Sequence, residues 1–233
     1  MQAPYKRTNP SPRYRELLAL YQAAHAQGLP GQNIDAEETF AGQSLGKHAS
    51  VVRQLIRTTG AKTLLDYGAG KGQLYRASGL KINGEIASDI RTYWGIEDVH
   101  LYDPGHTPYS ALPSGAFDGV ICTDVLEHVP QEDVPWVLGE IFGFARKFVF
   151  ANVASYPAHK ILPNGENAHA TIQPPQWWRQ QIDQVHPPGG VDYFILVEEK
   201  RHNKRGLIGK LMGPRRRRSK LTSRADWESL SAR

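Results

Sequence analysis

Lys62-Thr-Leu-Leu-Asp66-Tyr-Gly68-Ala-Gly70-Lys-Gly72 is the stretch of the chain that decides the fold. A short apolar run, residues 62–66, enters a turn with glycine at every second position, and residues 73–76 then begin a helical pattern. Glycines allow positive φ and a close approach of the backbone to a ligand. The N-terminus of the following helix offers free N–H donors. This arrangement predicts a nucleotide-binding turn between a strand and a helix.

Spacing separates the nucleotide chemistries that use such turns. A phosphate-binding P-loop needs Ser or Thr after its Gly-Lys pair, whereas Lys71 is followed by Gly72. The dinucleotide fingerprint needs a sixth-position glycine counted from Gly68, where this chain has Gln73. Both readings fit poorly, and the pattern that remains is D-x-G-x-G-x-G.

Four further apolar runs, at residues 99–102, 117–123, 147–153 and 193–197, have the length of strands. Residues 134–146 between the second and third of these runs have helical character, and residues 13–27 and 45–59 show apolar stripes at helical spacing. Apolar runs without polar alternation, separated by helices, predict a mostly parallel sheet with helices on both faces.

Two of these segments carry a family resemblance. Asp66–Gly72 resembles motif I of class I S-adenosylmethionine-dependent methyltransferases, and residues 117–130, FDGVICTDVLEHVP, resemble the fourth-strand region of that superfamily. The resemblance spans roughly residues 60–155. It implies an α/β Rossmann-like methyltransferase domain at residues 60–199, after an N-terminal arm and helical cap at 1–59 and before a basic, flexible tail at 200–233.

The resemblance also implies which residues hold S-adenosyl-L-methionine. By position these are Asp66, Gly68, Gly70 and Gly72, then an acid that ends the second strand and binds the ribose hydroxyls, and Thr123 and Asp124 after the later strand. Asp103 is favoured as the ribose ligand because the run before it is strand-like, and Asp89 is its rival. Asp66 to Asp103 spans 37 positions and Asp103 to Asp118 only 15, so we expect one strand-helix unit to be lost or shrunken after Asp103, with an insertion before it.

Asp124-Val-Leu-Glu127-His128 is the candidate catalytic element. A histidine near neutrality can serve as a general base for a hydroxyl acceptor. The element also resembles the metal-binding motif of small-RNA 2′-O-methyltransferases, which implies that Asp124, Glu127, His128 and His169 could bind Mg²⁺ or Mn²⁺. Alternatively, Glu127 caps backbone groups and His128 lines the pocket without metal. The catalytic candidates are therefore His128, Asp124 and His169.

The acceptor pocket is expected around residues 162–179, which combine polar groups with Trp177 and Trp178, the alternative being that the tryptophans anchor a helix. Further candidates are Phe40, Gln43, Lys47 and His48, each with surface packing of a helical cap as the alternative, and Tyr156 and His159, which follow the strand-like run at 147–153. We expect O- or N-methylation of a small molecule or saccharide. The alternatives are metal-assisted RNA 2′-O-methylation and a non-catalytic module that keeps the cofactor fold.

Charge is unevenly distributed along the 233 residues, whose net charge is +5. Residues 200–224 hold eleven Lys or Arg and no acid, whereas residues 1–199 hold 16 basic and 21 acidic residues, a net of −5. The basic segment could bind nucleic acid or an anionic membrane surface, or could simply be solvated. The single Cys122 excludes an internal disulfide, and no apolar stretch has the length of a membrane span or a secretory signal, so a cytoplasmic protein is expected.

Overall fold

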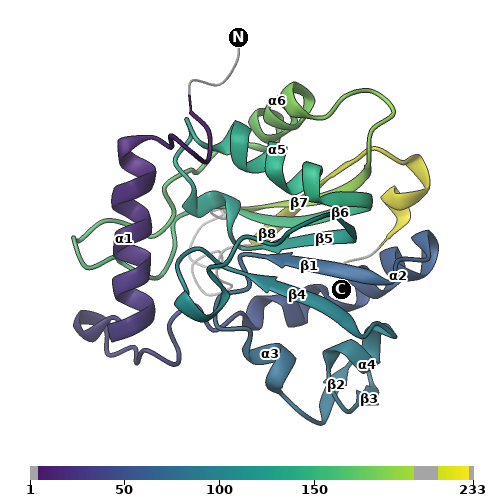
Figure 1. Ribbon diagram of the computed structural model, residues 1–233, viewed down its shortest axis with the longest axis horizontal. Coiled ribbons are helices and arrows are strands. Elements are labelled where there is room, and N and C mark those ends of the chain that lie inside the picture. Colours follow the sequence, from purple (N-terminus) through teal and green to yellow (C-terminus); the bar gives the residue numbers. More distant parts are fainter. Residues whose placement is uncertain (1–4, 202–214, 231–233) are drawn as a thin grey trace, which may run out of the picture.

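A six-stranded sheet organises the computed structural model, which describes residues 5–201 and 215–230 (Figure 1). The strand order is β4-β1-β5-β6-β7-β8, and every neighbouring pair is parallel except β7 with β8. The strands are β1 (Thr63–Tyr67), β4 (Asp98–Tyr102), β5 (Phe117–Thr123), β6 (Ala145–Ser155), β7 (Asp192–Arg201) and β8 (Arg215–Thr222). The predicted α/β architecture with a mostly parallel sheet is confirmed.

Helices cover both faces of this sheet because its central strands are apolar on both sides. On one face, Leu65 and Val149 pack against α5 (Val134–Phe144) and α6 (Pro175–Val185). On the other face, Leu64 and Phe148 pack against α2 (Ala49–Thr59) and α4 (Ile90–Trp94). Figure 1 shows α5 and α6 above the strands, α4 below them and α2 to their right.

The two connections that flank β1 differ greatly in length. The chain from β1 to β4 passes through α3 (Gln73–Arg76), a hairpin of β2 (Leu80–Ile82) and β3 (Glu85–Ala87), and α4. The chain from β4 to β5 contains only one 3-10 turn, Thr107–Tyr109. The expected loss of a strand-helix unit between Asp103 and Asp118 is therefore confirmed. Because β4 and β5 both run parallel to β1, this short connection returns from the carboxyl end of β4 to the amino end of β5.

The N-terminal segment corrects the predicted division at residue 59. Helix α2 is part of the sheet's core rather than of a separate cap, because its apolar side is buried against β6. Helix α1 (Pro12–Gln27) does stand apart, and Figure 1 shows it at one side of the sheet. The arm before it is held in place: Arg7 forms an ion pair with Glu140, and Ser11 binds Asp133 through both its N–H and its hydroxyl.

The prediction of a flexible basic tail is wrong for the residues that form β8. This strand pairs antiparallel with β7 from Phe194↔Thr222 to Arg201↔Arg215, and the buried Trp227 after it packs on the α2 face. The pairing is favourable because Arg216 and Arg218 find the buried carboxylate of Glu198 on the neighbouring strand. Residues 202–214 of the predicted tail lie outside the described residues. Within the described ranges, no helix combines the length and apolarity needed to cross a bilayer.

Candidate functional site

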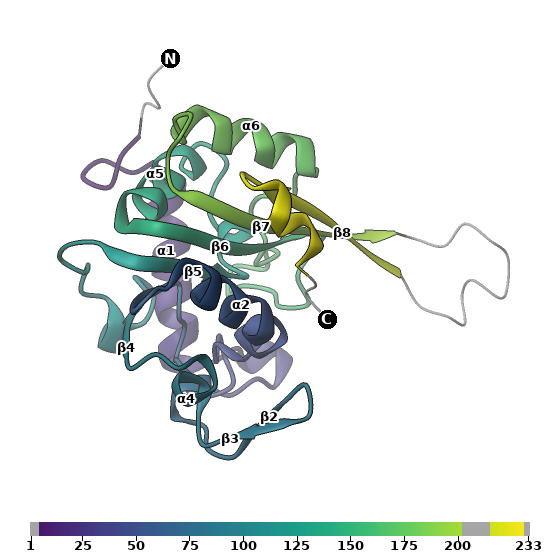
Figure 2. The same ribbon diagram turned by 90° about the vertical axis from the view of Figure 1, so that its right-hand side faces the viewer.

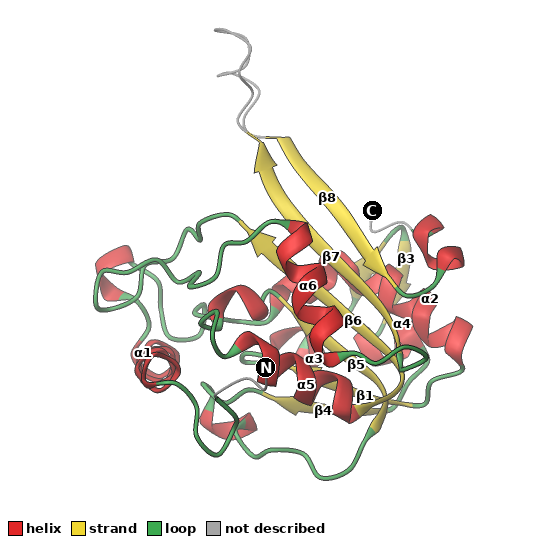
Figure 3. Cartoon of the chain, turned by 90° about the horizontal axis from the view of Figure 1, so that it is seen from above, coloured by secondary structure: helices red, strands yellow, loops and turns green. Residues whose placement is uncertain are grey.

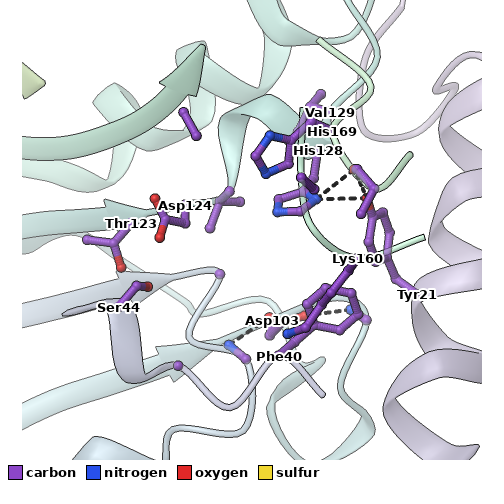
Figure 4. A pocket seen from close by; sticks show the side chains of 18 of the residues that line it. Tyr21, Phe40, Ser44, Asp103, Thr123, Asp124, His128, Val129, Lys160 and His169 are labelled. Atoms are coloured by element: carbon purple, nitrogen blue, oxygen red, sulfur yellow. Dashed lines mark hydrogen bonds between the residues drawn. The ribbon is translucent and has the colours of Figure 1, made fainter. Parts of the chain in front are cut away.

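A cavity of about 440 Å³ opens at the carboxyl ends of β1, β4 and β5 (Figure 4). Helix α1 forms one wall through Tyr14 and Tyr21, and the loop after β6 forms another through Tyr156 and His169. From β1 the chain first adds β4 on one side and then returns to add β5 on the other side. The order of the strands therefore reverses at β1, which makes this position a topological switch point. Ligands of open α/β sheets bind at this place, and the volume lies within the range of small-molecule sites.

The glycine turn forms the floor of this cavity. Gly68 and Gly70 line it with φ of +88° and +56°, in the region that disfavours side chains. A Cβ on Gly70 would lie 2.2 Å from the carbonyl oxygen of Phe40, and one on Gly68 would lie 2.2 Å from Val125 Cγ2. The predicted Gly72 is placed differently, since its α-carbon faces Leu101 rather than the cavity.

Asp103 projects into the cavity from the end of β4, beside the glycine turn (Figure 4). Its carboxylate accepts hydrogen bonds from the N–H groups of Gly70 and Gly105, both at 2.8 Å. A carboxylate has about four lone-pair positions, so it can still accept two further O–H groups. The rival Asp89 is exposed and caps α4 through the N–H of Thr92 at 2.8 Å. The geometry favours Asp103 as the candidate ribose ligand.

Asp66 does not lie where the prediction put it. The residue is buried on the opposite side of β1, where Oδ2 accepts a hydrogen bond from the Tyr75 hydroxyl at 2.8 Å, and it does not line the cavity. Burial raises the pKa of Asp66 to about 7. Its neighbour Tyr67 takes the cavity side because successive side chains of a strand alternate.

Asp124 and Thr123 line the cavity at the end of β5, as predicted. Asp124 adopts a left-handed φ of +53°, which a residue other than glycine tolerates only when its surroundings fix it. Those surroundings are Asn152, whose side-chain amide donates to the Asp124 carboxylate and whose carbonyl accepts the Asp124 N–H at 3.1 Å. Burial raises the pKa of Asp124. The strained backbone turns this carboxyl group into the cavity (Figure 4).

His128 lies across the cavity from Asp124 in a fixed orientation. Its Nδ1 is 2.8 Å from the Ala168 carbonyl oxygen, and Tyr21 donates its hydroxyl to the same carbonyl. A carbonyl only accepts, so Nδ1 carries the proton and the neutral ring keeps a lone pair on Nε2. In Figure 4 this second nitrogen lies on the side of the ring away from Tyr21. Burial lowers the pKa of His128 to about 3, which keeps the ring neutral.

His169 stands next to His128, with ring centroids 4.9 Å apart and planes nearly perpendicular. Its Nδ1 donates to the Tyr156 carbonyl at 2.5 Å, so this ring also keeps a lone pair on Nε2. Asn167 positions the segment by bonding the backbone of Ala158 in both directions and accepting the N–H of His169. Burial lowers the pKa of His169 as well. The structure therefore brings the three catalytic candidates together around one cavity.

The predicted metal set is not assembled. Glu127 is buried outside the cavity, where Oε1 accepts the N–H of Ala154 at 2.9 Å, and burial raises the pKa of its carboxyl group well above the usual range. In the described part of the chain, no group of three or more His, Cys, Asp or Glu residues is placed to hold a metal ion. These residues do not fit Mg²⁺ or Mn²⁺, and the alternative in which Glu127 binds backbone fits better.

The acceptor candidates divide between cavity and core. Phe40, Gln43, Tyr156 and His159 line the cavity, whereas Lys47 and His48 do not. Among residues 162–179, only Ala168 and His169 line it, because Trp178 is buried in the sheet's core and Trp177 packs beside it. Cavity residues that the sequence analysis did not single out include Tyr14, Tyr21, His25, Ser44, Lys160 and Arg216. The apolar stripe of α1 was a signal for the first two, since part of it faces this cavity.

Comparisons with protein-family models, with curated proteins and with solved structures found no match for this chain.

Proposed function

We propose that this protein is an S-adenosylmethionine-dependent methyltransferase. The observation that carries the proposal is the meeting of the Asp103 carboxylate with the backbone of Gly68 and Gly70 in one cavity at the switch point of the sheet. An acceptor-only carboxylate suits the two hydroxyls of a ribose. The close-packed glycine turn suits an extended ligand that lies along the backbone. Thr123 and Asp124 line the same cavity from the adjacent strand.

The residues that line the cavity fit S-adenosylmethionine, a molecule with vicinal hydroxyls on its ribose and charged groups at its other end. When bound, S-adenosylmethionine supplies an electrophilic methyl group on a sulfonium. The chain's own task is then to place an acceptor in line and to take its proton. His128 is suited to accept a proton at Nε2, because Nδ1 is fixed by the Ala168 carbonyl and the ring is neutral.

Desolvation determines the protonation state of the His128 ring. Burial and the neighbouring His169 lower the pKa of His128 to about 3, which keeps the ring unprotonated but also makes it a weak base. As a proton arrives from the acceptor, the Ala168 carbonyl and the Tyr21 oxygen stay in place and limit reorganisation. The carboxyl group of Asp124 lies across the cavity from His128, and burial raises its pKa. The site thus supports transfer to a hydroxyl or an amine on a small molecule or saccharide.

RNA methylation is the second candidate, since the basic strand β8 contributes Arg216 to the cavity wall. The two candidates, and a module that binds cofactor without turnover, separate in one assay. Radiolabelled S-adenosylmethionine is incubated with the protein and either a small-molecule extract or total RNA, with His128→Gln as the paired variant. We expect label in the small-molecule fraction that depends on His128. Label confined to RNA would favour the second candidate, and cofactor binding without label in either fraction would contradict catalysis.

A further inference from the structure

Strands β7 and β8 carry a group of charged side chains on one face. Glu198 lies opposite Arg218, and Lys200 lies opposite Arg216. Opposed residues of an antiparallel pair share a face, and so do alternate residues of one strand. The four residues Glu198, Lys200, Arg216 and Arg218 are named here the cationic face. Figures 2 and 3 show that the paired strands run outward past the rest of the sheet.

Within this face the cationic side chains outnumber the carboxylates. Three cations and one carboxylate give a formal charge of +2. The buried Glu198 accepts from Arg218 Nε at 2.7 Å and from Arg216 Nη1 at 3.2 Å, so one acid serves two guanidinium groups. Among the described residues no carboxylate pairs with Lys200, and Arg216 has N–H groups beyond the one that Glu198 accepts.

The cationic face reaches the candidate site through Tyr156. Lys200 Nζ lies 4.3 Å from the centroid of the Tyr156 ring, and Arg216 Cζ lies 5.5 Å from it. Both Tyr156 and Arg216 line the cavity. The Tyr156 ring is 6.1 Å from that of His169, which in turn is 4.9 Å from His128. Arg216 therefore stands at the cavity wall, and Lys200, which does not itself line the cavity, lies beside it against the Tyr156 ring.

We propose that the methyl acceptor is a phosphorylated small molecule, such as a sugar phosphate, whose phosphate is bound by Arg216 and Lys200. A phosphate monoester carries a charge of about −1.5 to −2 at neutral pH, which matches the cationic face. The planar fork of Arg bonds two phosphate oxygens, and Lys adds a point charge. This inference rests on the proposed function, because it names the substrate class for the same cavity.

Binding of ribose 5-phosphate tests the proposal without requiring turnover. The probe is titrated into the full chain and followed by ³¹P and protein NMR, beside ribose and inorganic phosphate. The variants are Arg216→Gln and Lys200→Gln. The matched control is Arg217→Gln, which removes the same charge from the same strand but lies opposite Glu199 on the other face.

We expect ribose 5-phosphate to bind the wild type more tightly than ribose does, and inorganic phosphate to compete with it. Each cationic-face variant should weaken binding about tenfold, the effect of losing a charge-assisted hydrogen bond, while Arg217→Gln changes it less than about twofold. Lys200→Gln keeps both ion pairs of Glu198, so its loss of affinity cannot be attributed to unfolding.

Three results would overturn the inference: no saturable shift with ribose 5-phosphate, equal loss in Arg216→Gln and Arg217→Gln, or binding of ribose as tight as that of its phosphate. Tight binding of a single-stranded RNA that contacts both the cationic face and the opposite face with Arg217, with a steep salt dependence, would indicate that the acceptor is a polymer and not a small molecule. Titration with S-adenosylhomocysteine is run in parallel. Loss of that binding alone would refute the proposed function and leave the phosphate site standing.

Discussion

Gly70→Ala perturbs the contact between the glycine turn and the loop that covers it. Gly70 has a φ of +56°, and an added Cβ would lie 2.2 Å from the carbonyl oxygen of Phe40. That oxygen also accepts the N–H of Lys71 at 3.0 Å, so the obstacle is backbone that cannot rotate away. The left-handed conformation alone costs alanine about 1 kcal/mol. The overlap adds about 1–3 kcal/mol, as overpacking does.

Gly60→Ala separates these two costs. Gly60 ends α2 with a similar φ of +62°, and an added Cβ there has nothing within 4 Å. Urea unfolding should therefore show a loss of about 1 kcal/mol for Gly60→Ala and about 2–4 kcal/mol for Gly70→Ala. The displaced Phe40 lines the cavity, so only Gly70→Ala should also weaken cofactor binding. Equal losses of stability in the two variants would refute the reasoning about the covered turn.

Three further predictions concern other groups. His128→Gln should lower the rate of methyl transfer by about 10²-fold or more, as measured by radiolabel incorporation into the accepting fraction. The control His100→Gln changes a histidine outside the cavity and should leave that rate unchanged. Asp66 has a folded pKa of about 7, above the value near 4 expected for the unfolded chain, so it stabilises the fold at low pH. Relative to Asp66→Asn, the wild type should lose about 4 kcal/mol between about pH 4 and about pH 7 and then level off, which denaturant titrations would reveal; a flat difference would contradict the burial argument. Arg7→Ala should cost about 2 kcal/mol because it leaves the half-buried Glu140 without its cation, and an unchanged melting temperature would show that the arm contributes nothing.

The central strands β1, β5, β6 and β7 could be predicted from the sequence because each contains a short apolar run that is buried on both faces. The run at residues 117–123 matches β5, and the short path from Asp103 to Asp118 correctly indicated a missing unit. Strand β8 could not be predicted, because its four consecutive arginines look like a solvated charge run. Its pairing depends on Glu198, a buried acid on another strand, which no local pattern reveals.

The site was predictable in part for the same reason. Asp103, Thr123, Asp124 and His128 follow strands whose carboxyl ends meet at one edge, so their convergence follows from the topology. Which way a side chain turns from a strand end depends on its register. Asp66 therefore points away from the cavity and binds Tyr75. Glu127, in the turn after β5, also points away from the cavity and binds the backbone of Ala154. The place of α1 in the cavity wall could not be predicted, because it depends on long-range contacts of the preceding arm. These contacts join Arg7 to Glu140 and Ser11 to Asp133.

Calorimetric titration of S-adenosylmethionine into the wild type, Asp103→Asn and Asp89→Asn measures whether the cavity binds the cofactor through Asp103. The two variants make the same chemical change at the two acids that compete for the ribose. We expect saturable binding by the wild type, a loss of at least about tenfold in Asp103→Asn, and no loss in Asp89→Asn, whose carboxylate caps α4 at the surface. Absence of binding by the folded wild type, or an equal effect of the two variants, would contradict this expectation.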